Sequence, residues 1–124
     1  MDMAITAMIA GLLLAGQAAA TPANDVAFDE LAAGADRAAI EKIEANSALN
    51  ENDPARLINL GIAHAREGRE DLAREYFSAV VANPDRYQME TAEGKWVDSR
   101  NLGRQALAML NRGEFSTARY AANR

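Results

Sequence analysis

The chain has 124 residues, of which 49% are hydrophobic and 25% are charged, and its formal net charge is −5. This composition is typical of a single soluble domain, and the acidic balance argues against a protein that tracks nucleic-acid phosphates with a basic face. Cysteine is absent and there is one histidine, which excludes disulfides, thiolate nucleophiles and Cys- or His-rich metal sites. We therefore predict neither a metal nor a cofactor.

The first twenty residues, MDMAITAMIAGLLLAGQAAA, form a segment of their own. An apolar run over 4–15 is followed by small residues, a pattern typical of a secretory signal peptide cleaved before Thr21. The run is shorter than the roughly 20 residues that span a membrane, so we expect no integral span in the mature chain. The absence of Lys or Arg before the apolar run departs from this pattern, and an uncleaved anchor or a buried apolar helix is the alternative. Cleavage would place the protein in the periplasm or outside the cell.

Two short helices are predicted at the start of the mature chain. The first covers about 26–33 and is ended by Gly34, since glycine readily adopts the left-handed conformation at a helix C-terminus. The second is capped by Asp36 and runs to about Leu49. Its apolar residues recur at helical spacing and predict one buried face, made of Ala39, Ile40 and Ile43.

A longer helix pair follows. Asp53 is expected to cap a helix that has Pro54 at its first position, where the missing N–H of proline costs nothing. Gly68 ends that helix. The next helix carries a wide apolar stripe and stops at Asn83-Pro84; the stripe consists of Leu72, Ala73, Tyr76, Phe77, Val80 and Val81.

The pattern changes to alternating polar and apolar residues over 86–97, which predicts a small β-hairpin with its turn near 92–95. An irregular loop is the alternative. Trp96 is predicted to cover the core beneath the hairpin, with a role as an exposed interface anchor as the alternative. Asp98 or Ser99 then caps a helix to about Asn111, and a last short helix is expected over 114–122.

The stretch from Pro54 to Pro84 resembles a tetratricopeptide repeat (TPR), a helix–turn–helix unit of about 34 residues. In the first helix, the residues that carry the resemblance are Leu57, Leu60-Gly61 and His64; in the turn and second helix they are Gly68, Ala73, Phe77 and, one residue early, Pro84. The pairs Gly34/Ala39 and Gly113/Ala118 repeat the spacing of Gly68/Ala73. Both flanks therefore look like incomplete repeats.

The resemblance implies an all-α fold in which antiparallel helix pairs stack as a short right-handed solenoid. The predicted signal peptide covers 1–20 and the helical domain 21–124. Within the domain, the resemblance implies a degenerate repeat over 26–50, the best repeat over 54–84, the hairpin insertion over 86–97 and a truncated repeat over 99–124. The chain is also similar to small exported bacterial TPR proteins.

For function, the resemblance implies a protein-interaction adaptor of the cell envelope that binds a peptide or helix in a concave groove. Carried onto this chain, the partner-binding positions are Ile58, Asn59, Ile62, Arg66, Arg100 and Arg104. The arginines would suit an acidic group on the partner, because guanidinium pairs with carboxylate through two parallel hydrogen bonds. Solvated or acid-paired arginines are the alternative. A second reading of the whole chain is a self-associating structural protein that forms a homodimer.

An enzyme is not expected, because the sequence contains no phosphate loop, dinucleotide fingerprint or nucleophile elbow. His64 stands where the repeat usually has an aromatic residue. We predict that it is a histidine at the edge of the core, because no neighbouring residue is a candidate nucleophile or metal ligand. No catalytic residue is assigned.

Overall fold

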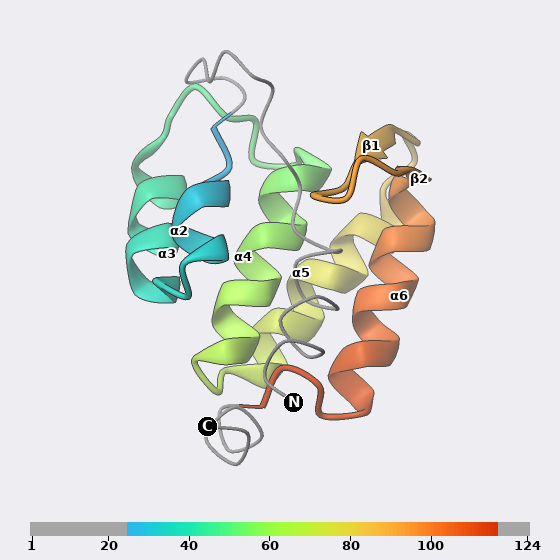
Figure 1. The fold of residues 1–124 in the computed structure, drawn as a ribbon. Helices are drawn as coiled ribbons and strands as arrows, with labels where there is room; N and C mark the ends of the chain where they lie inside the picture. The colour runs from blue at the N-terminus through green and yellow to red at the C-terminus, as the bar shows by residue number, and fades with distance from the viewer. Residues whose placement is uncertain (1–24, 117–124) are drawn as a thin grey trace.

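The computed structural model describes residues 25–116, which form a mainly helical fold with one small sheet (Figure 1). In chain order the elements are α2 (Phe28–Ala32), α3 (Asp36–Ala45), α4 (Pro54–Arg66), α5 (Glu70–Ala82), β1 (Gln88–Glu90), β2 (Trp96–Asp98) and α6 (Ser99–Asn111). The predicted signal peptide and most of the predicted last helix, over 114–122, lie outside the described residues. A helical fold with a hairpin near 86–97 is as predicted.

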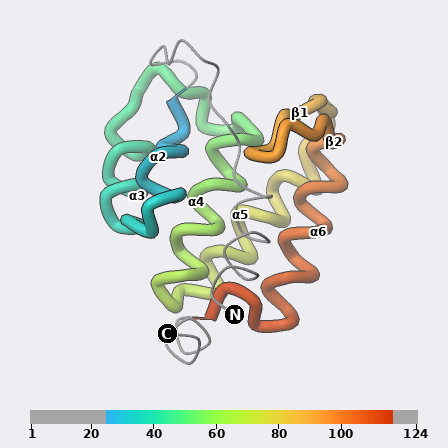
Figure 2. Tube along the Cα trace, viewed as in Figure 1, coloured from blue at the N-terminus to red at the C-terminus, as the bar shows by residue number. Residues whose placement is uncertain are grey.

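Successive helices run in opposite directions and lie side by side (Figures 1 and 2). The long helix α4 lies between α3 and α5, and α6 packs along α5 while also touching α4. The short helix α2 packs on α3 and reaches α4. The hairpin lies at the end of the molecule where α4 begins and α5 ends. Every described helix is too short or too polar to cross a membrane.

Local signals set the ends of the longer helices as predicted. The carboxylate of Asp53 accepts a hydrogen bond of 3.1 Å from the backbone N–H of Arg56 and caps α4. The carboxylate of Asp98 accepts bonds from the N–H groups of Arg100 and Asn101 and caps α6. Between α4 and α5, Gly68 has φ = +86°, a backbone conformation that residues with a side chain adopt only with strain.

The structure corrects two expectations about α3. Ala35, not Asp36, stands at the N-cap, no side chain caps the helix, and the Asp36 carboxylate is directed instead to Arg66. The helix also ends at Ala45, four residues before the expected Leu49. The Asn46 side-chain oxygen accepts from the N–H of Ala48, which closes a turn in competition with continued helix.

Two glycines allow the long helices to approach closely. A Cβ atom built on Gly61 would lie 2.7 Å from Cδ1 of Phe77, so the Phe77 ring fills the space next to the α4 backbone. A Cβ atom on Gly103 would lie 2.8 Å from Cγ2 of Val81, which shows the same close approach between α6 and α5. Phe77 also contacts Phe115, at 5.9 Å between ring centroids, and both side chains are buried. These contacts make α4, α5 and α6 one packed layer.

In the hairpin, Met89 pairs with Val97 and Glu90 pairs with Trp96 in an antiparallel register. Because side chains alternate across a strand, Met89 and Val97 share the face toward the core, and Trp96 lies on the opposite face. Trp96 is 61% exposed. The prediction that Trp96 covers the core is therefore wrong: the side chains that do so are the buried Met89 and the partly buried Val97.

Candidate functional site

Three of the residues predicted to bind a partner are fully buried. Ile58 and Ile62 belong to the hydrophobic core. Asn59 is equally inaccessible, and its side-chain amide donates a hydrogen bond of 2.9 Å to the backbone oxygen of Val26. This corrects the expectation that these side chains line an open groove: Asn59 fixes the segment before α2 onto α4 instead.

Arg66, a fourth predicted partner residue, is largely buried as well. Its Nη1 donates to Oδ1 of Asp36 and to the backbone oxygen of Leu31, each at 2.9 Å. The side chains of Arg66 and Asp36 are 10% and 11% exposed. Burial raises the pKa of Asp36 above 3.8, and the attraction of Arg66 offsets part of this effect. Arg66 thus joins α4 to the end of α2 and the start of α3.

The two arginines of α6 have different surroundings. Arg100 donates through Nε and Nη2 to the backbone oxygen of Asn83, and through Nη2 to that of Pro84, over 3.0–3.2 Å. It satisfies carbonyl groups just beyond the end of α5, where helical partners are missing. Arg104 is exposed and donates to the side chain of Asn101, one turn earlier on the same helix. Arg100 therefore has a structural contact that sequence reasoning did not predict.

His64 lies at the edge of the core, as predicted, and is 6% exposed. Its ring stacks on Tyr76, with centroids 5.6 Å apart, and its Nδ1 accepts a hydrogen bond of 2.9 Å from Arg69. Burial lowers the pKa of His64 below 6.5, and the nearby Arg69 charge lowers it further. Within residues 25–116, no group of three or more His, Asp or Glu side chains could hold a metal ion.

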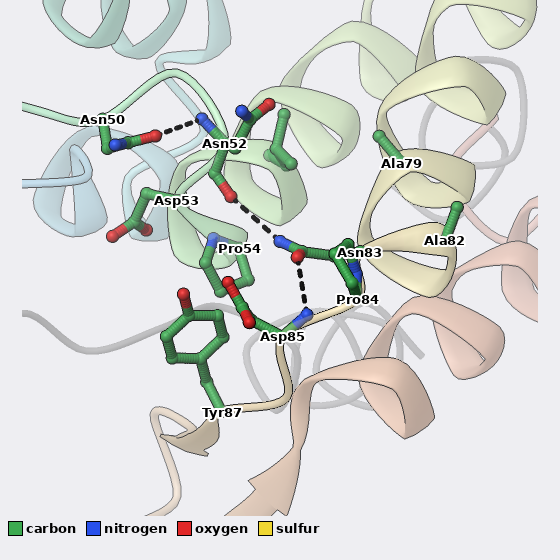
Figure 3. A pocket seen from close by; sticks show the side chains of 11 residues that line it. Asn50, Asn52, Asp53, Pro54, Ala79, Ala82, Asn83, Pro84, Asp85 and Tyr87 are labelled. Carbon is green, nitrogen blue, oxygen red and sulfur yellow. Dashed lines mark hydrogen bonds between the residues drawn. The ribbon is translucent and has the colours of Figure 1, made fainter.

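An open pocket of about 610 Å³ lies where α4 begins, α5 ends and the hairpin starts (Figure 3). Two segments distant in sequence form it: 50–57, and 79–87, which includes the last turn of α5 and the residues that lead into the hairpin. Its apolar wall consists of Pro54, Leu57, Ala79, Ala82 and Pro84, with the ring of Tyr87 at one side. Volumes of this order are typical of ligand pockets.

The polar wall of the pocket consists of Asn50, Asn52, Asp53, Asn83 and Asp85. The asparagines mainly hold the rim together. The Asn83 side chain donates to the backbone oxygen of Asn52 at 3.4 Å and accepts from the N–H of Asp85 at 3.0 Å. The Asn50 side chain accepts from the N–H of Asn52 at 2.8 Å, and both segments are therefore fixed by local turns (Figure 3).

The two aspartates of the pocket carry the charge. Neither Asp53 nor Asp85 forms an ion pair with a described residue, and the pocket lining contains no basic side chain. Tyr87 is 45% exposed, and its hydroxyl lies on the same side of the pocket as the two carboxylates (Figure 3). The pocket therefore combines two unpaired negative charges with an accessible aromatic ring.

The dipoles of the two helices also affect the electrostatics of the pocket. The last turn of α5 borders the pocket with the negative end of its dipole. The positive end of α4 is weakened there, because Pro54 has no N–H and the Asp53 carboxylate takes up that of Arg56. The lining of the pocket thus carries two carboxylates, one of which, Asp53, also caps α4, and no basic side chain.

No family model, curated protein or solved structure matches this chain. Sequence reasoning also missed the pocket. In the sequence, Asn83 marks only the end of a helix, and the alternating pattern over 86–97 predicts a hairpin without indicating a pocket. A sequence signal was present in Asp53 and Asp85, two acidic residues beside the prolines that bound the helix pair.

Proposed function

We propose that this chain is a protein-interaction module in which a short stack of TPR-like helix pairs holds a binding pocket at one end. The contacts of each helix with the next, and of α4 with α2 and α6, are those expected of stacked pairs. Gly34 and Gly68 both have positive φ and stand about one 34-residue repeat apart. The interval to Gly113 is longer because the hairpin intervenes.

The observation that carries this proposal is the pocket beside Tyr87. Predicted groove residues on α4 are buried, whereas Tyr87 and the rim asparagines are accessible. Tyrosine contributes contact area at small entropic cost and retains a polar end, which is why it is frequent at interfaces. The partner surface is therefore assigned to the end of the helix pair rather than to the face of α4.

The proposal includes export and the absence of catalysis. The segment 1–20 acts as a signal peptide, and the remaining domain works in the periplasm or outside the cell. Sequencing the N-terminus of the protein recovered from its native host tests this part: a chain that begins at Thr21 is expected, and an intact Met1 in membranes would indicate an anchor.

The test of the interaction function is cross-linking and capture from envelope extract with two matched variants. Tyr87→Ala removes the accessible ring of the pocket, and Trp96→Ala removes an accessible ring on the outer face of the hairpin. We expect a captured protein to be lost with Tyr87→Ala and kept with Trp96→Ala. Capture that is the same for the wild type and both variants, or absent with the wild type, would contradict the proposal.

Self-association is the second candidate, and the exposure of Trp96 favours it. A tryptophan that is 61% exposed on a two-stranded sheet is a natural anchor for a second copy. Light scattering over a dilution series decides between the two. A dimer that Trp96→Ala dissociates would support this candidate, and a monomer at all concentrations would exclude it.

A further inference from the structure

We propose that the pocket beside Tyr87 receives an arginine side chain from the partner protein. This inference rests on the proposed interaction function and names the chemistry of the bound group. It starts from the charge of the pocket: Asp53 and Asp85 both line it, and neither forms an ion pair with a described residue. A cationic group of the partner would complete the pair that this chain leaves open.

The shape and lining of the pocket favour guanidinium over ammonium. The Tyr87 ring offers a face on which a planar cation stacks, and such contacts are more frequent for arginine than for lysine. The two aspartates present several carboxylate oxygens to one cavity, which suits the five N–H donors of arginine. The apolar wall of Pro54, Leu57 and Pro84 suits the aliphatic stem of the side chain.

The protein itself contains an example of such chemistry close by. Arg100, which does not line the pocket, donates to two carbonyl oxygens just beyond the end of α5, those of Asn83 and Pro84. The same two residues line the pocket. The end of α5 thus already binds one guanidinium through its negative dipole end, and the pocket adds two carboxylates that Arg100 does not use.

The experiment is a titration of the full-length, isotope-labelled protein followed by amide NMR shifts. The probes are three capped pentapeptides, Ala-Ala-X-Ala-Ala, in which X is arginine, lysine or the neutral isostere citrulline. We expect the arginine peptide to shift the amides of 52–53 and 85–87 and to bind at millimolar strength, as suits one exposed side chain. The lysine peptide should bind more weakly, and the citrulline peptide should cause no shifts at the same concentration.

A charge-matched pair of variants locates the site. Asp53→Asn/Asp85→Asn removes both pocket charges and keeps the α4 cap, since asparagine caps helices as well as aspartate. Asp71→Asn/Glu75→Gln removes two exposed charges of α5 that do not line the pocket. We expect the first variant to bind the arginine peptide about tenfold more weakly, because two exposed charge contacts each contribute modestly. The second variant should bind like the wild type.

Several outcomes would overturn the inference: no shifts with the arginine peptide up to about 10 mM, equal binding of citrulline, or equal weakening in both variants. A dimer that dissociates only in the pocket variant would identify a second copy as the occupant. A failure of the arginine inference can be distinguished from a failure of the proposed interaction function. Capture that depends on Tyr87 but not on Asp53 and Asp85 would leave the interaction function intact and remove the arginine. Peptide binding without any captured protein would do the reverse.

Discussion

The two sides of helix α4 are attached to the molecule by different physical means. Toward α5, the helix makes a close apolar contact in which Gly61 leaves room for the buried ring of Phe77. Toward α2 and α3, buried polar groups add directed contacts: Asn59 to the oxygen of Val26, and Arg66 to Asp36. A close-packed contact depends on volume and area, whereas a buried polar contact depends on complete pairing. The first side should respond to cavities and the second to the loss of one partner.

The largest effect is expected for Phe77→Ala, which removes the ring by which α5 packs against α4 and against Phe115. Truncating a fully buried phenylalanine should lower the free energy of unfolding by about 3–5 kcal/mol. Urea denaturation followed by circular dichroism measures it. The exposed neighbour Ser78, changed to Ala, is the control and should change stability by less than about 0.5 kcal/mol. A loss below about 1 kcal/mol for Phe77→Ala would mean that the close-packed side is not the main support.

Arg66→Met should have the next largest effect, because it leaves the Asp36 carboxylate buried without its charge partner. Loss of one member of a buried ion pair costs about 3–5 kcal/mol, and the slight exposure of this pair places the expectation at the lower end. Hydrogen exchange should show the loss first in α2 and α3, since Arg66 holds both to α4.

The double variant Arg66→Met/Asp36→Leu provides the control for that experiment. Replacing both charges with apolar groups removes the unpaired carboxylate, so most of the lost stability should return. Uniform loss of protection across α4, α5 and α6 in the single variant would break the comparison, because it would show that the two sides unfold together.

Asn59→Ala should have a smaller effect on the same side of α4. It removes the hydrogen bond to the backbone oxygen of Val26 and leaves that oxygen to find another partner, at a cost of about 1–3 kcal/mol. Thermal unfolding measures the change. A variant as stable as the wild type would show that this contact orders the chain before α2 without contributing to its attachment.

The smallest effect is the pH dependence from His64. Its pKa is lowered in the folded state, so between that value and 6.5 the unfolded chain binds more protons than the folded one. Stability is therefore unaffected by His64 above about pH 6.5 and falls as the pH decreases through this window. Glu44 of α3 and Glu67 oppose the shift, and burial outweighs them. Denaturation at several pH values should give a shallower dependence for His64→Phe, which retains a ring against Tyr76; an identical slope would contradict the assignment.

Features encoded in neighbouring residues could be predicted from the sequence. Asp53-Pro54, Gly68 and Asp98 mark helix ends because capping and left-handed backbone are local properties. The alternating pattern near Met89 identified the hairpin for the same reason. The sequence predicts Asp36 as a helix cap because capping is a local property. In the structure its carboxylate accepts a hydrogen bond from Arg66, thirty residues later in the chain, and does not cap the helix.

Features that depend on packing could not be predicted in the same way. The sequence shows that Ile58 and Ile62 are apolar, but it does not distinguish an apolar groove from a core. Large aromatic side chains are usually buried, which favours a buried Trp96. The strand register instead places its side chain on the exposed face of the hairpin. The pocket could not be predicted because it forms only where the start of α4, the end of α5 and Tyr87 come together in space.

Contacts beyond the pairing of the two strands close the base of the hairpin. The backbone N–H of Ser99 donates to the oxygen of Tyr87 at 2.8 Å, the N–H of Tyr87 donates to the Ser99 hydroxyl, and Arg86 pairs with Asp98. Arg100 meanwhile holds the end of α5 beside the start of α6. The two ends of the hairpin, at 86–87 and 98–99, are thus held at a fixed distance from each other. A longer or unrelated loop grafted between 90 and 96 would therefore start and end at a base of fixed geometry. The entropic cost of closing such a loop rises only slowly with its length.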